Sequence, residues 1–358
     1  KASPSTHNRC SIVRESCVYQ PVLASRFRQT DLVLVRAFQL IENQPVLTAD
    51  YPDPVRSVGQ ALVRPLFIMI TPADLGATRN PDTQGVLGNQ FVGIVEDSDR
   101  KDLIGQRVVA DVNITDPAST YAQRGLGHHD PERKILGLRS FNGCLCERFM
   151  IPDRNLVIVP DEIESERAVF AAQLAAAIHV SRVQRVEGKT FVTVLGGDLM
   201  ALLCAQIMGT LNTSVRMITG RSDRLELCAK WGVKHRNLGE VGRRADQDIV
   251  INTMSEPDSI ATSLRMVRPR GALILQSHPT IGIEEQRIAH NDLSLIIERE
   301  LRIYGSRCGQ ISDGLDALQS GRVDLSGLIT KRVHFSEVMA GMRASIEPQH
   351  IGVLVQMD

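Results

Sequence analysis

The residues best suited to chemistry form a few small groups. His128, His129 and Asp130 are consecutive and could recruit a metal ion. Adjacent side chains on a loop diverge, however, and a closed metal site needs convergent ligands, so solvated loop residues are the favoured interpretation. Cys144 and Cys146 are two residues apart and fall on one face of an expected strand. Packed free thiols are the more common outcome for such a pair than metal ligands.

Two further candidates lie later in the chain. His179 ends the apolar run FAAQLAAAIHV and is expected to be a core or interface histidine rather than a base. Cys308 lies in GSRCG beside Arg307, with Arg302 close by. An exposed thiol beside arginines could be reactive, but a thiol needs an accessible, electropositive setting for that, and a buried, inert cysteine is the default expectation.

Length, charge and cysteine usage narrow the class of protein. The chain has 358 residues, enough for two domains, because single cores stop growing near ~250–300 residues. A formal net charge of zero provides no field to hold nucleic acid or an anionic membrane. The longest mostly apolar stretch, residues 168–180, is shorter than the ~20 residues of a membrane span, so we expect a soluble protein. Seven scattered cysteines favour a reducing compartment.

Residues 1–30 differ in composition from the rest of the chain. They are rich in serine and arginine and contain a single acid, Glu15. Such a composition is typical of an organelle transit segment, which would indicate a plastid or the mitochondrial matrix. The alternative is a disordered basic tail on a cytoplasmic protein.

The remaining chain changes its periodicity twice. Residues 31–160 contain short β-like runs broken by Gly, Pro and Asp, which is typical of a small barrel or sandwich. Residues 161–293 alternate strands such as TFVTVLGG with helices such as LMALLCAQIMG, which predicts an α/β domain with a doubly wound parallel sheet. Residues 294–358 return to mixed pieces, as if the chain rejoined the first domain.

This layout, together with a series of motifs, resembles the medium-chain dehydrogenase/reductase superfamily over about residues 50–355. ITPADL, VLGNQFVGIVE, GQRVVADVNI, VLGGDLMALLCAQIM and GSRCG in succession are similar to its zinc-dependent alcohol and polyol dehydrogenase branch. The resemblance implies a GroES-like β-barrel domain followed by a Rossmann domain. Function still has to be argued from the site itself.

The resemblance also indicates which residues replace the catalytic zinc ligands. Thr71 stands at the cysteine position, Asn89 at the histidine position, Gln90 at a neighbouring glutamate position, and Ala172 at a further carboxylate position. Ala73 replaces a hydroxyl residue that relays a proton. Neutral amides and hydroxyls are weak zinc ligands beside thiolate, imidazole and carboxylate. We therefore expect no catalytic zinc.

A second family metal site is equally altered. In the lobe that holds a structural zinc, the four cysteine positions correspond to Asp116, Ser119, Ala122 and Asp130. Because a structural zinc site requires four converging soft or imidazole ligands, the resemblance predicts that this zinc is absent too.

The residues at the expected dinucleotide site favour two opposite conclusions. The family's G-x-G-x-x-G corresponds here to Gly196, Gly197, Asp198 and then Ala201, so that an acid replaces the second fingerprint glycine where a pyrophosphate would rest. As an alternative, Asp198 is simply a good helix cap. Gly220 and Arg221 follow the next strand, and a small residue followed by arginine suits a 2′-phosphate, so NADPH is the expected dinucleotide if one binds. Arg221 could equally pair with Asp223.

Two functions remain open. The first is a catalytically degenerate, zinc-free relative with a structural, regulatory or assembly role. The second is a zinc-independent NADPH-dependent reductase of a quinone or enone. The resemblance implies a homo-oligomer, paired through the apolar strand GALILQSH, or a subunit of a larger assembly.

Overall fold

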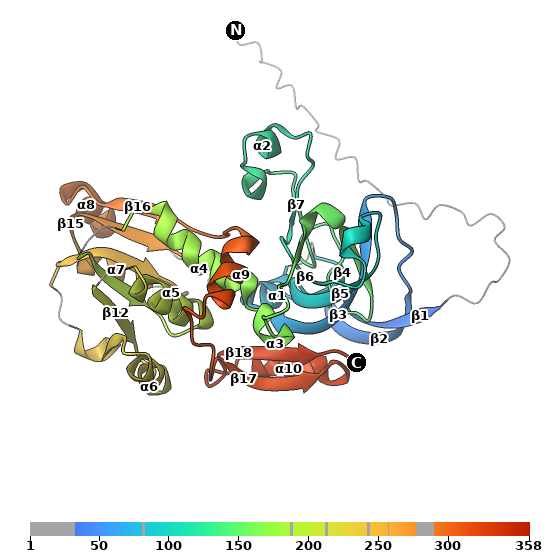
Figure 1. Ribbon diagram of the computed structural model, residues 1–358. Helices are drawn as coiled ribbons and strands as arrows, with labels where there is room; N and C mark the ends of the chain where they lie inside the picture. Colours follow the sequence, from blue (N-terminus) through green and yellow to red (C-terminus); the bar gives the residue numbers. More distant parts are fainter. Residues whose placement is uncertain are drawn as a thin grey trace, which may run out of the picture. The chain divides into compact units, whose positions relative to one another are not determined.

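The amino-terminal half folds into sheets of mostly antiparallel strands, one of which is completed by two parallel strands from the end of the chain (Figure 1). The computed structural model describes residues 33–80, 83–186, 189–211, 214–241, 244–256, 258–276 and 290–358, and Leu34–Asp358 form one compact unit. The basic segment 1–30 lies outside the described residues. Within the described ranges one sheet has the order β10-β6-β5-β3-β18-β17, with β9 paired to β3, and another has the order β2-β1-β4. The strands are β1 (Leu34–Ile41), β2 (Gln44–Pro52), β3 (Gln60–Ile70), β4 (Gly85–Val86), β5 (Gln90–Asp97), β6 (Arg107–Ala110), β9 (Phe149–Pro152), β10 (Leu156–Ile158), β17 (Ile329–His334) and β18 (Gly352–Gln356).

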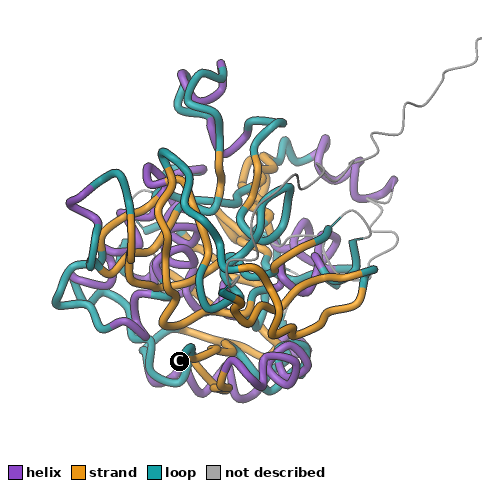
Figure 2. Tube along the Cα trace, turned by 90° about the vertical axis from the view of Figure 1, so that its right-hand side faces the viewer, coloured by secondary structure: helices purple, strands orange, loops and turns teal. Residues whose placement is uncertain are grey.

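The last thirty residues complete the core of this barrel. Val353 and Val355 on β18 are buried in the same cluster as Val63 and Ile68 on β3, and the two strands pair in an antiparallel manner. Helices α1 (Pro72–Ala77) and α10 (Val338–Ala344) accompany these strands. A small lobe carrying β7 (Asn113–Ile114), β8 (Lys134–Ile135) and α2 (Thr120–Gln123) projects from the barrel, as Figures 1 and 2 both show.

The middle of the chain forms a parallel sheet. Its order is β13-β12-β11-β14-β15-β16 in the described part of the chain, so the direction of winding reverses between β11 and β14. In doubly wound sheets, ligands bind at the carboxyl ends of the strands beside this reversal. The strands are β11 (Phe191–Leu195), β12 (Ser214–Thr219), β13 (Lys234–Asn237), β14 (Gln247–Asn252), β15 (Val267–Leu275) and β16 (Arg302–Gly305). The connecting helices are α3 (Ser165–Ala168), α4 (Ala171–Val183), α5 (Leu199–Gly209), α6 (Ser222–Lys230), α7 (Ser259–Met266), α8 (His290–Glu298) and α9 (Ile311–Gln319).

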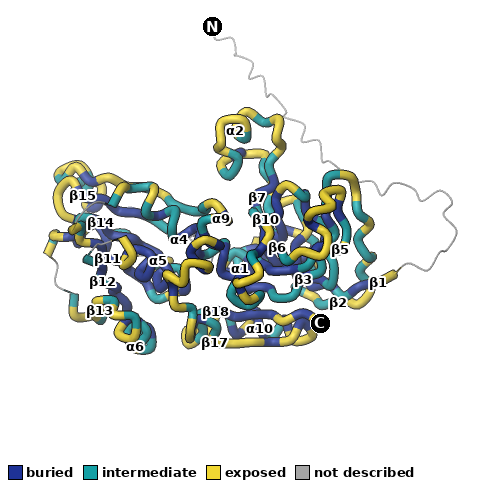
Figure 3. Tube along the Cα trace, in the orientation of Figure 1, coloured by how far each residue is buried: buried dark blue, intermediate teal, exposed yellow. Residues whose placement is uncertain are grey.

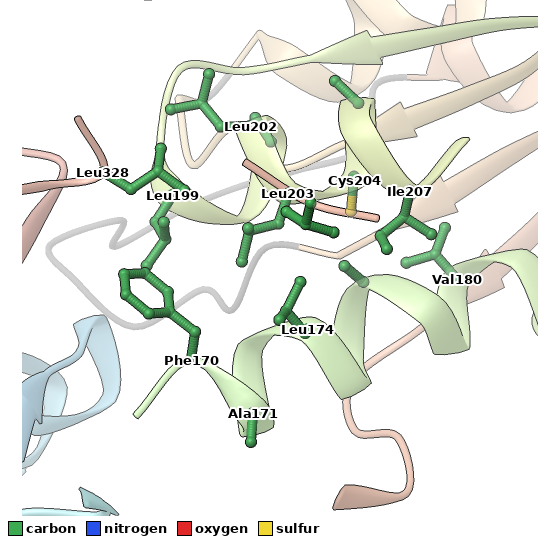
Figure 4. Packing of buried hydrophobic residues seen from close by; sticks show 14 of the residues in the cluster. Phe170, Ala171, Leu174, Val180, Leu199, Leu202, Leu203, Cys204, Ile207 and Leu328 are labelled. Atoms are coloured by element: carbon green, nitrogen blue, oxygen red, sulfur yellow. The ribbon is translucent and has the colours of Figure 1, made fainter. Parts of the chain in front are cut away.

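Both faces of the parallel sheet are buried, because successive side chains of a strand point to opposite faces. Val194 lies in one core cluster, which also contains the buried residues of α4 and α5. Val250 lies in another, which contains Leu264 of α7. Figure 3 shows the central strands β11 and β14 as mostly buried segments, with exposed positions on the outer helices and loops. In Figure 4, Leu174 and Val180 of α4 face Leu203 and Ile207 of α5.

The predicted fold class is confirmed: a barrel domain of GroES-like type with a Rossmann-type parallel sheet. Two details differ from expectation. The boundary expected at residue 294 is misplaced, because β16 hydrogen-bonds to β15 and stays in the parallel sheet. Residues 271–275 of the run GALILQSH belong to β15, which has neighbours on both sides, so β16 is the edge strand instead. No helix in the described residues is both long and apolar enough to cross a membrane.

Candidate functional site

Thr71, Asp74 and Asn89 meet in a buried hydrogen-bonded network at the end of β3. Thr71 caps α1: its N–H and Oγ1 donate to Asp74 Oδ2 at 2.8 and 2.7 Å. Asn89, at the entry to β5, donates from Nδ2 to Thr71 Oγ1 at 3.0 Å and to Asp74 Oδ1 at 3.1 Å. Their exposures are 3, 0 and 4%, so the network excludes water and its polar atoms satisfy one another.

Burial governs the protonation of this network. Desolvation raises the pKa of Asp74 to about 6, against hydrogen bonds from Thr71 and from the backbone of Gly88 that favour the carboxylate. Cys144 lies beside it, and burial, followed by the charge of Asp74, raises the pKa of this thiol well above its usual range. Gly88 has φ +95°, and a Cβ there would meet Cys144 Sγ and Leu145. The turn therefore packs against a neutral, protonated thiol.

Gln90 and Ala172 are placed differently. Gln90 begins β5 opposite Met69, and its Oε1 is buried without a hydrogen-bond partner in the described structure. Ala172 is half-buried on α4 and packs against the larger core cluster. Ala73 is half-buried on α1. Neither alanine has a side-chain atom that could bind a metal or transfer a proton.

The lobe positions 116, 119, 122 and 130 do converge, through hydrogen bonds. Ser119 caps α2 by accepting from Ala122 N at 3.0 Å. Asp116 Oδ1 accepts from Ala118 N at 2.9 Å, and Asp130 Oδ1 from Glu132 N at 2.8 Å. The hydrogen bond from Ser119 holds the pKa of Asp130 below its usual range. Local turns and caps thus hold the lobe together.

A second polar cluster joins the lobe to the segment after β16. Arg307 donates to His128 O at 2.6 Å and to Asn113 Oδ1 at 3.2 Å. His128 Nε2 pairs with Asp111 Oδ2. Burial of Asp111 opposes ionisation, but the hydrogen bond and charge of His128 hold the pKa of the carboxyl below its usual range. Cys308 is half-buried, and burial raises the pKa of its thiol.

The remaining candidates from the sequence are His179 and Arg302. Burial lowers the pKa of His179, which is half-buried on α4. Arg302 is exposed at the sheet edge and donates to Arg270 O at 3.1 Å. Across the residues that the structure describes, no three His, Cys, Asp or Glu side chains gather into a potential metal site.

The turn between β11 and α5 is tightly packed. Gly196 has φ +149°, and a Cβ there would overlap Thr253 Oγ1 at 2.1 Å. Asp198 caps α5: its Oδ1 accepts from Ala201 N at 2.8 Å and from Thr253 Oγ1 at 2.8 Å. Asp198 is exposed as a residue, but desolvation of its hydrogen-bonded carboxylate raises the pKa of that group. The sequence reasoning identified the cap and missed Thr253, which approaches from the end of β14.

Two arginines of the next connection approach this turn. A Cβ on Gly197 would lie 3.5 Å from Cδ of Arg221, so the structure brings these two predicted residues together. Arg221 also pairs with Asp223 at 3.3 Å, as the alternative interpretation expected. Arg224 was missed: its side chain is 3% exposed, and it donates from Nε to Gly197 O at 3.1 Å. Its spacing of four residues from the buried Cys228 was the available signal.

Three buried polar atoms without partners lie at the carboxyl ends of neighbouring strands. They are Asn252 Nδ2, Gln276 Oε1 and Ser306 Oγ, unsatisfied within the described residues. Asn252 pairs with Leu275 across β14 and β15, and Leu275 pairs with Gly305 across β15 and β16, so the three follow one another along the sheet edge. Unsatisfied buried polar groups are costly and call for a binding partner.

No family model matches the chain. An uncharacterised zinc-type alcohol dehydrogenase-like protein of Haemophilus influenzae is 24% identical over 327 residues, 85% of this chain and 93% of the relative. A putative D-xylulose reductase of Agrobacterium fabrum is 25% identical over 290 residues, 76% of this chain and 81% of that one. Over most of its length the chain is similar to curated zinc-type alcohol and polyol dehydrogenases.

Solved structures of such dehydrogenases share the fold. A putative zinc-binding dehydrogenase of Sinorhizobium meliloti, bound to NADP, superposes with a TM-score of 0.80 at 20% identity, over 90% of this chain and 99% of that one. L-idonate 5-dehydrogenase of Escherichia coli gives a TM-score of 0.81 at 18% identity, over 90% and 98% of the two chains. At these identities the comparison supports the architecture, and the chemistry has to come from this chain's own residues.

Compared with the dehydrogenase pattern, Thr71 and Asn89 do converge, as the positions of two zinc ligands should. They converge on each other and on Asp74, however, and the amide of Asn89 presents its N–H groups as donors. The amide nitrogen has no lone pair for a cation, and the neutral amide and hydroxyl oxygens that remain are weak zinc ligands. The side chains at these positions therefore do not fit a zinc ion.

Proposed function

We propose that this chain is a zinc-free, catalytically degenerate relative of the alcohol and polyol dehydrogenases with a structural, regulatory or assembly role. The observation that carries the proposal is that Asn89 Nδ2 donates two hydrogen bonds, to Thr71 Oγ1 at 3.0 Å and to Asp74 Oδ1 at 3.1 Å. Metal-dependent alcohol oxidation needs an ion with an open position that lowers the pKa of the bound hydroxyl. A buried network whose polar atoms already bond one another provides no such position.

Loss of proton transfer supports the same proposal. The relay position is Ala73, and the further carboxylate position is Ala172. Asp74 is the acid of the network, and it is fully buried and engaged by Thr71 and Asn89. A general base must reach the proton that it removes. Asp74 has no such access.

The test is metal content and alcohol turnover of the purified chain. We expect less than stoichiometric zinc by elemental analysis after dialysis against zinc, and no oxidation of simple alcohols or polyols with either NAD or NADP. A tightly held, stoichiometric zinc ion, or robust turnover that a chelator abolishes, would contradict the proposal.

A second function is favoured by a specific observation: the orphaned atoms of Asn252, Gln276 and Ser306 at the carboxyl edge of the sheet. They provide an amide donor, a carbonyl acceptor and a hydroxyl, which suits a polar ligand lying along that edge. Arg221 beside Gly197 supplies a cation for a 2′-phosphate. These residues fit a dinucleotide, whereas the charge of Asp198 opposes one.

On this second proposal the protein is a zinc-independent NADPH-dependent reductase of a quinone or enone. NADPH, when bound, would supply the hydride. Asn252, Gln276 and Ser306 at the sheet edge would bind the polar groups of NADPH, and Arg221 would bind its 2′-phosphate. Titration with NADPH and NADH separates the two functions, because a ligand of the native state raises the free energy of unfolding by RT ln(1+[L]/Kd) and the unfolding temperature with it. Saturable NADPH binding below ~100 µM would favour the reductase, and no response at millimolar levels would favour the non-enzyme.

We also propose that the chain forms a homo-oligomer through the edge strand β16. Its Ile303 is 38% exposed, and an unpaired edge is a template for strand addition. A monomeric mass in light scattering would contradict this.

A further inference from the structure

A cavity lies at the amino-terminal ends of the parallel strands, away from the site discussed under the proposed function. It has a volume of about 620 Å³ and is lined by the first residues of β11, β12 and β13, by the last turns of α5 and α6, and by the loop after α9. Drug-sized ligand sites have volumes of ~300–1,000 Å³. The dinucleotide-type residues lie at the carboxyl ends of the same strands, so the two sites occupy different edges.

Three cations line this cavity: Lys189, Lys234 and Arg322. All three are exposed, and over the described ranges no ion pair joins any of them to a carboxylate. The acid beside the cavity, Asp324, is already engaged by Lys230 at 3.3 Å. Several cations that line one cavity create a positive potential there, which attracts an anion.

The cavity also has an aromatic wall. Phe191 is 53% exposed, which is unusual for a large apolar side chain at the start of a central strand. Trp231 is half-buried, and its Nε1 donates to Asp324 Oδ2 at 3.2 Å, so the ring has a fixed orientation. Gln206 holds Asp324 in turn, through bonds of 3.0 and 2.8 Å to its backbone O and N. This wall is therefore set by the fold before any ligand arrives.

We infer that this cavity binds a small aromatic phosphate monoester. Three cations match a dianion better than a singly charged carboxylate, and the phosphate's oxygens accept from lysine and arginine in charge-assisted hydrogen bonds. Phe191 and Trp231 supply apolar surface for the ring, which stacks in offset or edge-to-face geometry. The site would add a regulatory or second-ligand function that the dehydrogenase relationship does not imply.

The test uses the only tryptophan of the chain as its reporter. Phenyl phosphate is titrated while Trp231 emission is followed, with phenol, inorganic phosphate and benzoate as comparisons. We expect a saturable change with phenyl phosphate at a Kd of roughly 10 µM to 1 mM, and binding at least about tenfold weaker for each comparison compound. Inorganic phosphate binding as tightly as phenyl phosphate would overturn the aromatic part of the inference.

Charge variants test the cationic part. Lys234→Ala and Arg322→Ala should each weaken phenyl phosphate binding about fivefold, and the double variant about twentyfold. Lys134→Ala, an exposed lysine in the lobe, is the matched control and should leave binding unchanged. A double variant that binds as well as the Lys134 control would overturn the site.

A second measurement guards against indirect effects. The indole N–H of Trp231 gives a single resonance, whose shift should follow the same binding curve. Arg221 and Trp231 cap opposite ends of α6, so ten residue steps along the helix place them about 15 Å apart. Titration repeated in saturating NADPH should therefore give the same affinity. Competition between the two ligands would show that phenyl phosphate occupies the dinucleotide edge and would overturn the inference.

Discussion

Removing the charge of Asp198 should strengthen NADPH binding. This carboxylate lies at the first residue of the α5 connection, in the place where a fingerprint glycine would let the backbone approach a pyrophosphate. Its backbone has φ −84° and ψ 176°, an ordinary extended conformation, so a substitution does not strain the turn. Asp198→Asn removes the charge and retains the side-chain volume and an acceptor for the helix cap. Asp198→Gly removes both charge and volume.

The magnitude follows from Coulomb's law. Two unit charges ~5 Å apart repel by about 3 kcal/mol at an effective dielectric constant of ~20 and by about 0.8 kcal/mol in bulk water. Because Asp198 is exposed, we place the effect between these limits, at roughly tenfold in Kd for Asp198→Asn. Asp198→Gly should increase the affinity for NADPH further, because the backbone can then approach the phosphates. It should also lose about 1 kcal/mol of stability, since Thr253 Oγ1 loses its acceptor.

The assay is NADPH titration by calorimetry on the wild type and the two variants, at low and high salt. Asp316→Asn, which removes an exposed charge on α9, is the matched control. The advantage of the Asp198 variants should shrink as salt rises, because exposed charges are screened beyond ~10 Å at 0.1 M. The reasoning is refuted if Asp198→Asn and Asp316→Asn bind NADPH with the same affinity, or if no variant binds at millimolar concentration.

Three other predictions concern the network and the turn. Thr71→Cys combined with Asn89→His should confer zinc binding that elemental analysis detects, whereas uptake by the wild type to the same extent would contradict the proposed loss of the site. Burial raises the pKa of Asp74 to about 6 in the folded chain, so the folded state binds this proton more tightly than the unfolded state does. The contribution of Asp74 to the free energy of unfolding should therefore fall by about 3 kcal/mol as pH rises from ~4 to ~6. Urea denaturation of the wild type and of Asp74→Asn at a series of pH values checks this, and the same pH dependence of unfolding free energy in both proteins would disprove it. Arg224→Ala should lower the free energy of unfolding by roughly 3 kcal/mol, because Gly197 O and Pro348 O lose a buried donor. Arg221→Ala should be nearly neutral, because it removes only the more exposed ion pair with Asp223. Equal losses of stability for the two variants in thermal unfolding would contradict this prediction.

Local patterns predicted most of the architecture. The alternation of apolar strands with helices between residues 161 and 275 follows from period and propensity over short windows, and the structure contains β11, α5, β12, α6, β14, α7 and β15 in that order. β13 was missed, because KHRN has no apolar run at all. β13 is an edge strand that, among the described strands, pairs only with β12. It forms because β12 offers free backbone groups for pairing, and its own residue composition gives no strand signal.

The amino-acid sequence by itself determined which chemical groups are available: neutral side chains at Thr71 and Asn89, an acid at Asp198, and an arginine at position 221. Only the tertiary structure decided what those groups do. Asn89 turns its donor to Thr71 and Asp74, and Arg224 reaches across 124 residues of chain to Pro348. Residue type and short-range spacing fix charge and helix or strand preference. Hydrogen-bond partners and burial depend on which distant segments pack together, and no local pattern records that.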